Sequence, residues 1–172
     1  MMINIEIKAR CDDIERTEEN LNSLGAGPAG TFHQKDTYFK VDKGRLKLRE
    51  LEPDEGHLIF YTREDVPGPK RSDYELAFTS DPEAMRGILS KLLGISIEVE
   101  KTRQVWLWDD NVRVHLDEVK GLGRFIELEA VTDEKGVDES YQRVETLMRA
   151  LEIGSDQLIE GSYGDLLVQK GE

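Results

Sequence analysis

Apolar and polar residues alternate along much of the chain, a pattern typical of β-strands with one face toward a core and the other toward polar surroundings. The clearest example is the segment Ile3–Arg10, where three isoleucines alternate with Asn4, Glu6, Lys8 and Arg10. Seven further strand-like segments follow, separated by short polar or glycine-rich turns. They are Lys35–Val41, Arg45–Glu50, His57–Glu64, Tyr74–Phe78, Val99–Trp108, Asn111–Val119 and Phe125–Val131. The pattern therefore predicts eight strands.

Three other segments carry apolar residues at helical spacing. The first begins at Asp12 or Asp13 and ends at Gly25, the second begins at Ser80-Asp81-Pro82 and ends at Gly94, and the third runs from near Asp138 to Gly154. Each has one apolar stripe, so we expect each stripe to be buried against the sheet. The stripe residues are Ile14, Leu21 and Leu24 in the first helix, Met85, Ile88, Leu89 and Leu92 in the second, and Tyr141, Val144, Leu147 and Leu151 in the third.

Many strands and few helices favour an α+β fold: an eight-stranded antiparallel closed barrel with helices packed on its outside. The chain has 172 residues, enough for one substantial core. No internal repeat, low-complexity segment or long linker divides it. We therefore expect a single domain over residues 1–172.

The polar faces of the predicted strands segregate by charge. Arg45, Lys47 and Arg49 share one face, and Lys101 and Arg103 share another, whereas the strand Phe125–Val131 carries Glu127 and Glu129. If helices cover the outside of a closed sheet, these faces point inward and form a wet tunnel, because unpaired charges are too costly in a dry core. The excess of cations then predicts a polyanion, and the carboxylates predict a divalent metal. A flat sheet with one solvated face is the alternative that the pattern leaves open.

Composition narrows the classes of function. The formal net charge of −13 argues against a general nucleic-acid binder or a protein that binds anionic membranes. No apolar run is long enough to cross a bilayer, and no apolar segment of a signal peptide follows Met1. The single cysteine, Cys11, excludes an internal disulfide framework and fits a reducing cytoplasm, where we expect the protein to be located.

An ordered series of motifs resembles the CYTH superfamily, the triphosphate tunnel metalloenzymes, and most closely its class IV adenylyl cyclases. The similarity begins with Asn4-Ile5-Glu6-Ile7-Lys8, which is similar to a Glu-x-Glu-x-Lys signature. It covers nearly the whole chain and continues through Gln34–Phe39, Gly44–Arg49, Tyr61–Asp65, Gly68–Ser72, Lys101–Arg103, Arg113–Asp117, Gly121–Glu129 and Ser162–Leu167. The family fold is an eight-stranded antiparallel barrel that encloses a tunnel.

The resemblance also implies roles for particular residues. Triphosphate binding falls to Lys8, Arg10, Arg45, Lys47, Arg49, Arg63, Lys70, Lys101, Arg103, Arg113 and His115. The ligands of Mg²⁺ or Mn²⁺ would be Glu6, Glu127, Glu129 and Asp117, and with Lys8 these carboxylates form the expected catalytic set. Two residues have competing interpretations. Lys70 lies either in a solvated loop or in a flap over the phosphates, and His115 is either a proton carrier or, as we prefer, a hydrogen-bonding residue.

Asn4 is the main departure from the family pattern, because a neutral amide replaces the first carboxylate. An amide oxygen can bind a metal, but it brings no charge and cannot act as a base. Three functions stay open: a metal-dependent cyclase that converts ATP into cyclic AMP and pyrophosphate, a hydrolase of inorganic or thiamine triphosphate, and a module that binds a nucleotide or polyphosphate without turnover. The resemblance favours the cyclase, and base specificity rests on it alone. Because family members often dimerise, a homodimer is a candidate assembly.

Overall fold

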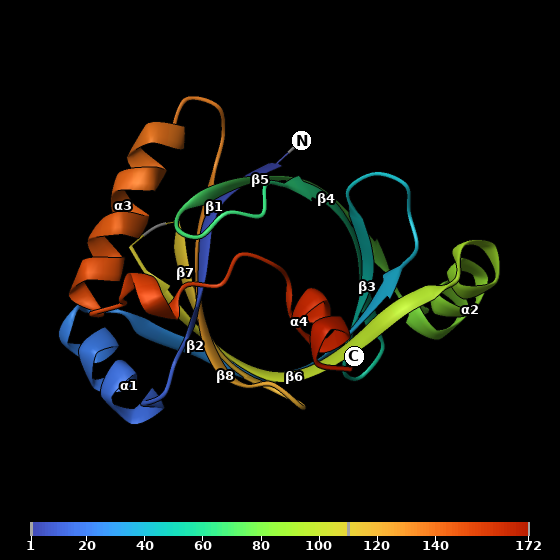
Figure 1. Ribbon diagram of the computed structural model, residues 1–172, viewed down its shortest axis with the longest axis horizontal. Helices are drawn as coiled ribbons and strands as arrows, with labels where there is room; N and C mark the ends of the chain where they lie inside the picture. The colour runs from blue at the N-terminus through green and yellow to red at the C-terminus, as the bar shows by residue number, and fades with distance from the viewer. Residues whose placement is uncertain (1, 110, 172) are drawn as a thin grey trace.

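The computed structural model describes residues 2–109 and 111–171, and within them eight strands close into an antiparallel barrel (Figure 1). The spatial order is β1-β5-β4-β3-β2-β6-β7-β8, with β8 paired back onto β1. This closure confirms the predicted fold class. The strands are β1 (Met2–Arg10), β2 (Gly27–Phe39), β3 (Arg45–Leu51), β4 (Glu55–Arg63), β5 (Lys70–Thr79), β6 (Ile95–Trp108), β7 (Val112–Val119) and β8 (Gly123–Thr132).

Two helices cover one wall of the barrel, α1 (Ile14–Ser23) and α3 (Val137–Ala150), which lie together on the left of Figure 1. Ile5 and Ile7 on the outer face of β1 are at most 1% exposed, and they belong to the same core cluster as Leu21 of α1 and Leu147 of α3. Burial of such side chains contributes about 2 kcal/mol each. The alternation in β1 therefore has a simple cause: isoleucines face the helices, and charged residues face the barrel interior.

Three strands begin at least four residues earlier than the alternation predicts. β2 starts at Gly27 instead of Lys35, β5 at Lys70 instead of Tyr74, and β6 at Ile95 instead of Val99. The early part of β2 pairs with β6 across a register shift near Gly30, whose φ of +140° is accessible mainly to glycine. Such a bulge interrupts the period of two, so the sequence pattern misses this part of the strand.

The second helix, α2 (Pro82–Leu93), forms where expected, and Asp81 caps it by accepting a hydrogen bond from the backbone N–H of Ala84. The prediction that its apolar stripe is buried was wrong. None of its residues, all within the described part of the chain, is buried, and Ile88 and Leu92 are 59% and 74% exposed. The physical reason is position: α2 projects from the side of the barrel beside β3 (Figure 1), so the sheet covers only one side of the helix.

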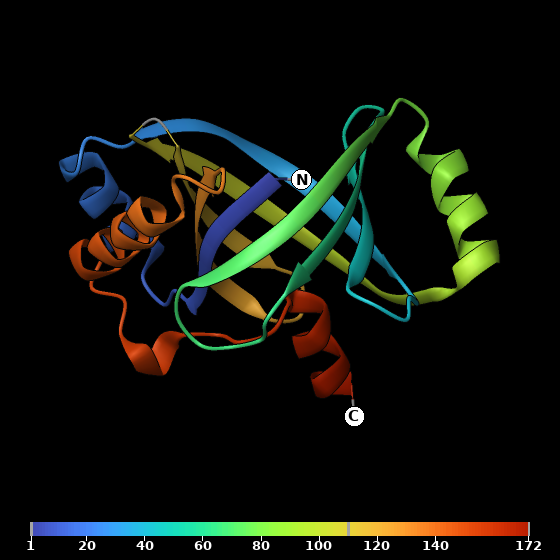
Figure 2. The ribbon, with the colours of Figure 1, turned by 90° about the horizontal axis from the view of Figure 1, so that it is seen from above.

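A fourth α-helix that the pattern did not predict, α4 (Tyr163–Gly171), lies at the end of the barrel opposite the N-terminus (Figure 2). Ser162 and Asp165 cap it reciprocally: Ser162 donates to the Asp165 carboxylate, and the Asp165 N–H donates to Ser162 Oγ. Gly164 allows close packing, since a Cβ there would lie 2.9 Å from Ile97. Only about two turns long, α4 shows too little periodicity to detect. No helix in residues 2–109 and 111–171 is both long and apolar enough to cross a membrane.

Candidate active site

The barrel encloses a cavity of about 350 Å³ that is lined by inward-facing side chains from all eight strands. The strand faces that carry the charges point into this cavity, so the alternative of a flat, solvated sheet is excluded. Among the described residues, the charged side chains that line it are Glu6, Lys8, Asp36, Lys47, Arg49, Arg63, Lys101, Arg103, Arg113, Glu127 and Glu129. We call this set the charged belt.

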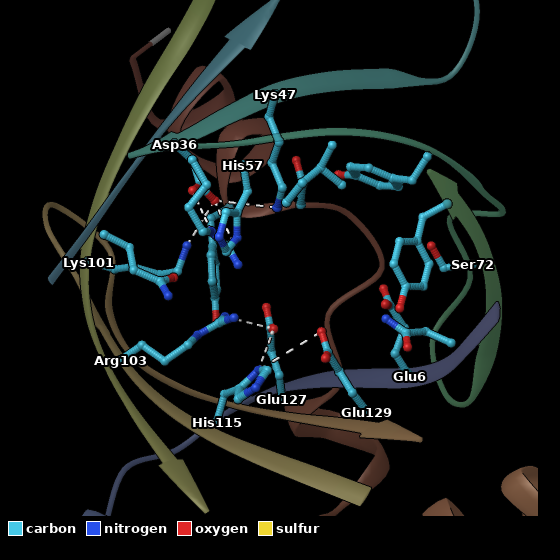
Figure 3. Close-up of a pocket in the computed structure, with 18 of the residues that line it drawn as sticks. Glu6, Asp36, Lys47, His57, Ser72, Lys101, Arg103, His115, Glu127 and Glu129 are labelled. Atoms are coloured by element: carbon cyan, nitrogen blue, oxygen red, sulfur yellow. Dashed lines mark hydrogen bonds and ion pairs between the residues drawn. The ribbon is translucent and has the colours of Figure 1, made fainter. Parts of the chain in front are cut away.

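One part of the charged belt is organised around Asp36, which is 1% exposed. Its carboxylate accepts two hydrogen bonds of 2.8 Å from Arg49 and one of 2.9 Å from Lys101, and Lys47 Nζ lies 3.4 Å away (Figure 3). Burial opposes ionisation of Asp36, but the three cations outweigh it and hold the pKa of the carboxyl well below its usual value. Burial, together with the nearby Arg49 and Arg103, lowers the pKa of Lys101 to about 7. Asp36 is thus an internal counterion for three of the predicted phosphate-binding cations.

A second part of the charged belt is organised around Arg103. Its guanidinium binds both oxygens of Asp117, at 2.7 and 2.6 Å, and also donates to Glu127 at 2.8 Å. Asp117 is fully buried and accepts a further hydrogen bond of 2.7 Å from the Tyr163 hydroxyl. Lys8 Nζ lies 2.7 Å from Glu127 and 4.0 Å from the centre of the Tyr163 ring. α4 therefore supports this part of the site directly.

Three side chains from the neighbouring strands β7 and β8 could hold a metal ion. His115 Nδ1 lies 3.5 Å from Glu127 Oε2 and 4.0 Å from Glu129 Oε1, and the candidate ligand atoms all lie within 4.8 Å of one another (Figure 3). Arg113 also donates to Glu129, at 3.0 Å. One nitrogen and two carboxylates form a chemically reasonable donor set for a divalent cation. Glu6 lies on β1, the strand next to β8, and its carboxylate forms an ion pair with Arg63 of β4.

Most of the predicted site residues meet in the cavity, but four, all within the described residues, do not line it. Asp117 lies behind Arg103. Arg10 is exposed, with its guanidinium 5.5 Å from the centre of the Phe125 ring. Arg45 binds Asp65 at 2.6 Å and Asp165 at 2.9 Å. Lys70 is 3% exposed, and its ammonium donates to the backbone carbonyls of residues 66, 159 and 160 instead of facing the cavity.

The cavity also has an apolar part that the charge pattern did not reveal. Phe32, Leu51, Leu76 and Val105, which we call the apolar collar, line it at the strand ends remote from α4. Gln34 lies on the same strand as Phe32, and Asn4 lies on β1, which pairs with β5; the side-chain oxygen of each is buried without a hydrogen-bond partner within the described chain. The signal for the apolar collar was present in the sequence, because Leu51 continues the inward phase of Lys47 and Arg49, and Val105 continues that of Lys101 and Arg103.

Comparison with known proteins is consistent across sequence and structure. Residues 2–163 match the CYTH domain family. A Methanocaldococcus jannaschii protein named as a candidate adenylate cyclase is 30% identical over 174 residues, which span 96% of this chain and 98% of that protein. The PH1012 protein of Pyrococcus horikoshii OT3 has a TM-score of 0.82 at 22% identity, covering 95% of this chain and 98% of that one.

A Hippeastrum protein is described as a candidate adenylyl cyclase with a dominant triphosphatase activity. Its structure gives a TM-score of 0.65 at 15% identity, covering 100% of this chain and 97% of that one. At such low identity the structural likeness bears on the fold alone, whereas the domain match spans residues 2–163 of the sequence itself. With a closed barrel around a charged cavity, this chain belongs to the CYTH domain family.

Proposed function

We propose that the protein binds an organic triphosphate inside the barrel and catalyses a divalent-metal-dependent reaction at its phosphates, most like the class IV adenylyl cyclase reaction. The observation that carries this proposal is the division of the cavity into a charged belt and an apolar collar. The charged belt suits the triphosphate, and the apolar collar suits an organic group attached to it. Inorganic tripolyphosphate would leave the apolar collar without a partner.

The balance of charge supports a polyanionic ligand. Within residues 2–109 and 111–171, seven cations and four carboxylates line the cavity, although the whole chain carries a formal net charge of −13. A cationic cavity inside an acidic protein concentrates positive potential at one place and discourages binding of phosphates elsewhere. Arginines and lysines arranged around a triphosphate would also offset the negative charge that develops as a phosphoryl bond breaks.

In the proposed reaction, the ribose 3′-hydroxyl attacks the α-phosphorus, the bond from the α-phosphorus to the bridging oxygen breaks, and pyrophosphate leaves. Lys8 and Arg103 form ion pairs with the Glu127 carboxylate, at nitrogen-to-oxygen distances of 2.7 and 2.8 Å. Both side chains line the cavity, so they are placed to bind phosphate oxygens as well. Glu127 and Glu129 would hold Mg²⁺ or Mn²⁺, which supplies Lewis-acid stabilisation of phosphate charge when it is bound. Because Asn4 cannot accept a proton as a base, the proton of the hydroxyl must go to another group or to water.

Hydrolysis is the second candidate function, in which water instead of the hydroxyl attacks a phosphorus atom. The cations of the charged belt would serve either nucleophile, so the belt alone does not favour cyclisation over hydrolysis. The difference between the two reactions lies in whether the apolar collar holds the nucleoside so that its hydroxyl reaches the α-phosphorus.

Product analysis tests the proposal. The protein is incubated with ATP, and separately with tripolyphosphate, in the presence of Mg²⁺ or Mn²⁺, and the products are resolved by chromatography. We expect cyclic AMP and pyrophosphate from ATP, and slow or no turnover of tripolyphosphate. Orthophosphate as the main product would identify a hydrolase, and tight binding without products would identify a binding module. The variant Glu129→Gln should lose the activity, whereas Glu118→Gln, an exposed position on the outer face of β7, should keep it.

A further inference from the structure

His115 lines the same cavity as the charged belt and has a buried ring nitrogen that can act as a metal ligand, unlike the guanidinium nitrogens of Arg63 and Arg113. The residue is 5% exposed, and its Nδ1 atom has no hydrogen-bond partner within the described chain. Leaving a buried nitrogen unsatisfied costs about 1–3 kcal/mol, so such an atom usually has a ligand. The neighbouring carboxylates do not satisfy it, because Glu127 and Glu129 lie 3.5 and 4.0 Å away, beyond a good hydrogen bond.

The strand register explains why these three side chains converge. His115 on β7 is paired with Glu127 on β8, and Glu129 lies two residues further along β8, on the same inward face. Two ligands bound to one ion at about 2.1 Å lie roughly 3 to 4 Å apart. The observed distances of 3.5 and 4.0 Å from His115 Nδ1 to the two carboxylates match this range, and all three candidate ligand atoms lie within 4.8 Å of one another.

Other carboxylates that face the charged belt or lie beside it are already engaged. Asp36 is bound by Arg49 and Lys101, and both oxygens of Asp117 are bound by Arg103. Glu127 and Glu129 also meet cations, but each carboxylate has about four lone-pair positions, so they can bind a metal and still accept those hydrogen bonds. The unpaired nitrogen thus lies beside the carboxylates that have spare capacity.

We propose that His115 Nδ1, Glu127 and Glu129 form a mixed nitrogen and oxygen site that binds a transition-metal ion such as Mn²⁺ more tightly than Mg²⁺. Mg²⁺ takes oxygen ligands and gives up its water reluctantly, whereas first-row transition metals accept an imidazole nitrogen readily. The inference deepens the proposed function and rests on it, because it identifies the kind of metal that the reaction would use. It assigns His115 to the metal instead of the phosphates.

The test uses the full chain with Mn²⁺ alone, so it requires neither substrate nor turnover. Electron paramagnetic resonance of free Mn²⁺ gives the dissociation constant, and competition with Mg²⁺ gives the relative affinity of the two ions. Electron spin echo modulation of bound Mn²⁺ then reports whether a ¹⁴N nucleus is directly coordinated. We expect a nitrogen signal in the wild-type protein and tighter binding of Mn²⁺ than of Mg²⁺.

A pair of histidine variants makes the assignment specific. His115→Asn should remove the nitrogen signal and weaken Mn²⁺ binding about 100-fold, while Mg²⁺ binding changes by less than about threefold because an amide oxygen remains available. His57→Asn is the matched control, since His57 lines the same cavity but lies on β4 and pairs with Glu55. It should leave both readouts unchanged.

The proposal fails if wild-type protein binds no Mn²⁺, if bound Mn²⁺ shows no nitrogen coupling, or if the coupling persists in His115→Asn. It also fails if that variant, folded by circular dichroism, loses Mn²⁺ and Mg²⁺ affinity equally. Should His115→Asn not fold, retention of the signal in His57→Asn still assigns the nitrogen, because the only other histidine, His33, is exposed and is not among the cavity-lining residues. Nitrogen-coupled Mn²⁺ without ATP turnover would uphold this site while overturning the proposed reaction.

Discussion

Asp36 lies on one side of the cavity and the pair Glu127 and Glu129 on another (Figure 3), and these carboxylates differ in how completely cations satisfy them. Asp36 accepts hydrogen bonds from Arg49 and Lys101 and lies beside Lys47, which leaves it little capacity for another ligand. Glu127 and Glu129 also meet cations, but they adjoin a histidine nitrogen that has no hydrogen-bond partner among residues 2–109 and 111–171. A buried carboxylate therefore cannot be assigned to a metal from its residue type. Its partners decide whether it serves as a counterion or as a ligand.

The largest expected effect is a loss of stability when Asp36 is substituted. Asp36→Asn leaves three cations with no internal counterion, so we expect the free energy of unfolding to fall by about 3–5 kcal/mol. Denaturation in urea measures it, with Asp42→Asn as an exposed control that should change little. Because the pKa of Asp36 is depressed in the folded state, this stabilisation is present above the unfolded pKa of about 4 and is lost as the pH falls through the folded value.

Added tripolyphosphate should restore part of the stability that Asp36→Asn loses, because a bound polyanion would replace the missing counterion. If the variant is as stable as the wild-type protein at neutral pH, the role of Asp36 as a counterion is refuted.

Substitutions of Glu127 or Glu129 should lower the activity more than the stability of the protein. Glu129→Gln removes a metal ligand, and we expect the metal-dependent rate to fall about 100-fold, equivalent to about 2.7 kcal/mol. Unfolding should change by only about 1 kcal/mol, because Arg113 on the same carboxylate is 41% exposed and can be solvated. Initial rates and urea denaturation provide the two measurements. A loss of stability as large as that of Asp36→Asn would remove the distinction between the two groups.

A smaller effect concerns pH. Because Lys101 has a pKa lowered to about 7, it loses its positive charge as the pH rises through 7, and tripolyphosphate affinity should fall by up to about tenfold between pH 6 and 8. Calorimetric titration at several pH values tests this. In Lys101→Met the decline should be nearly absent. An equally steep decline in that variant would assign the titration to another group or to the phosphate itself.

The smallest effect separates the charged belt from the apolar collar. Phe32 is 44% exposed, so Phe32→Ala should cost only about 1 kcal/mol of ATP binding, or roughly fivefold in affinity. Tripolyphosphate has no organic group, and its affinity should stay the same. Parallel titrations with the two ligands make the comparison, and equal losses for both would argue against an organic subsite at the apolar collar.

Local patterns predicted much of this molecule. The alternation in β1 identified both its buried isoleucines and its cavity-facing charges, because the period of two depends only on neighbouring residues. The sequence could not show that Asp36 lies between Arg49 and Lys101, since Lys101 is 65 residues away and meets Asp36 only through the pairing of β2 with β6. Burial of α2 was misjudged for the same reason: its stripe is visible locally, whereas the surface that should cover it depends on the fold.

The position of α4 has a practical consequence for how the protein should be prepared. α4 lies at one end of the barrel and the N-terminal end of β1 at the other (Figure 2), where Met2 is in register with the cavity-lining Tyr74. An affinity tag fused ahead of β1 would begin beside the apolar collar, where it could obstruct ligand entry and mimic a loss of activity. A tag placed after α4 would extend from the opposite end, and it is therefore the fusion in which the binding and turnover experiments are best made.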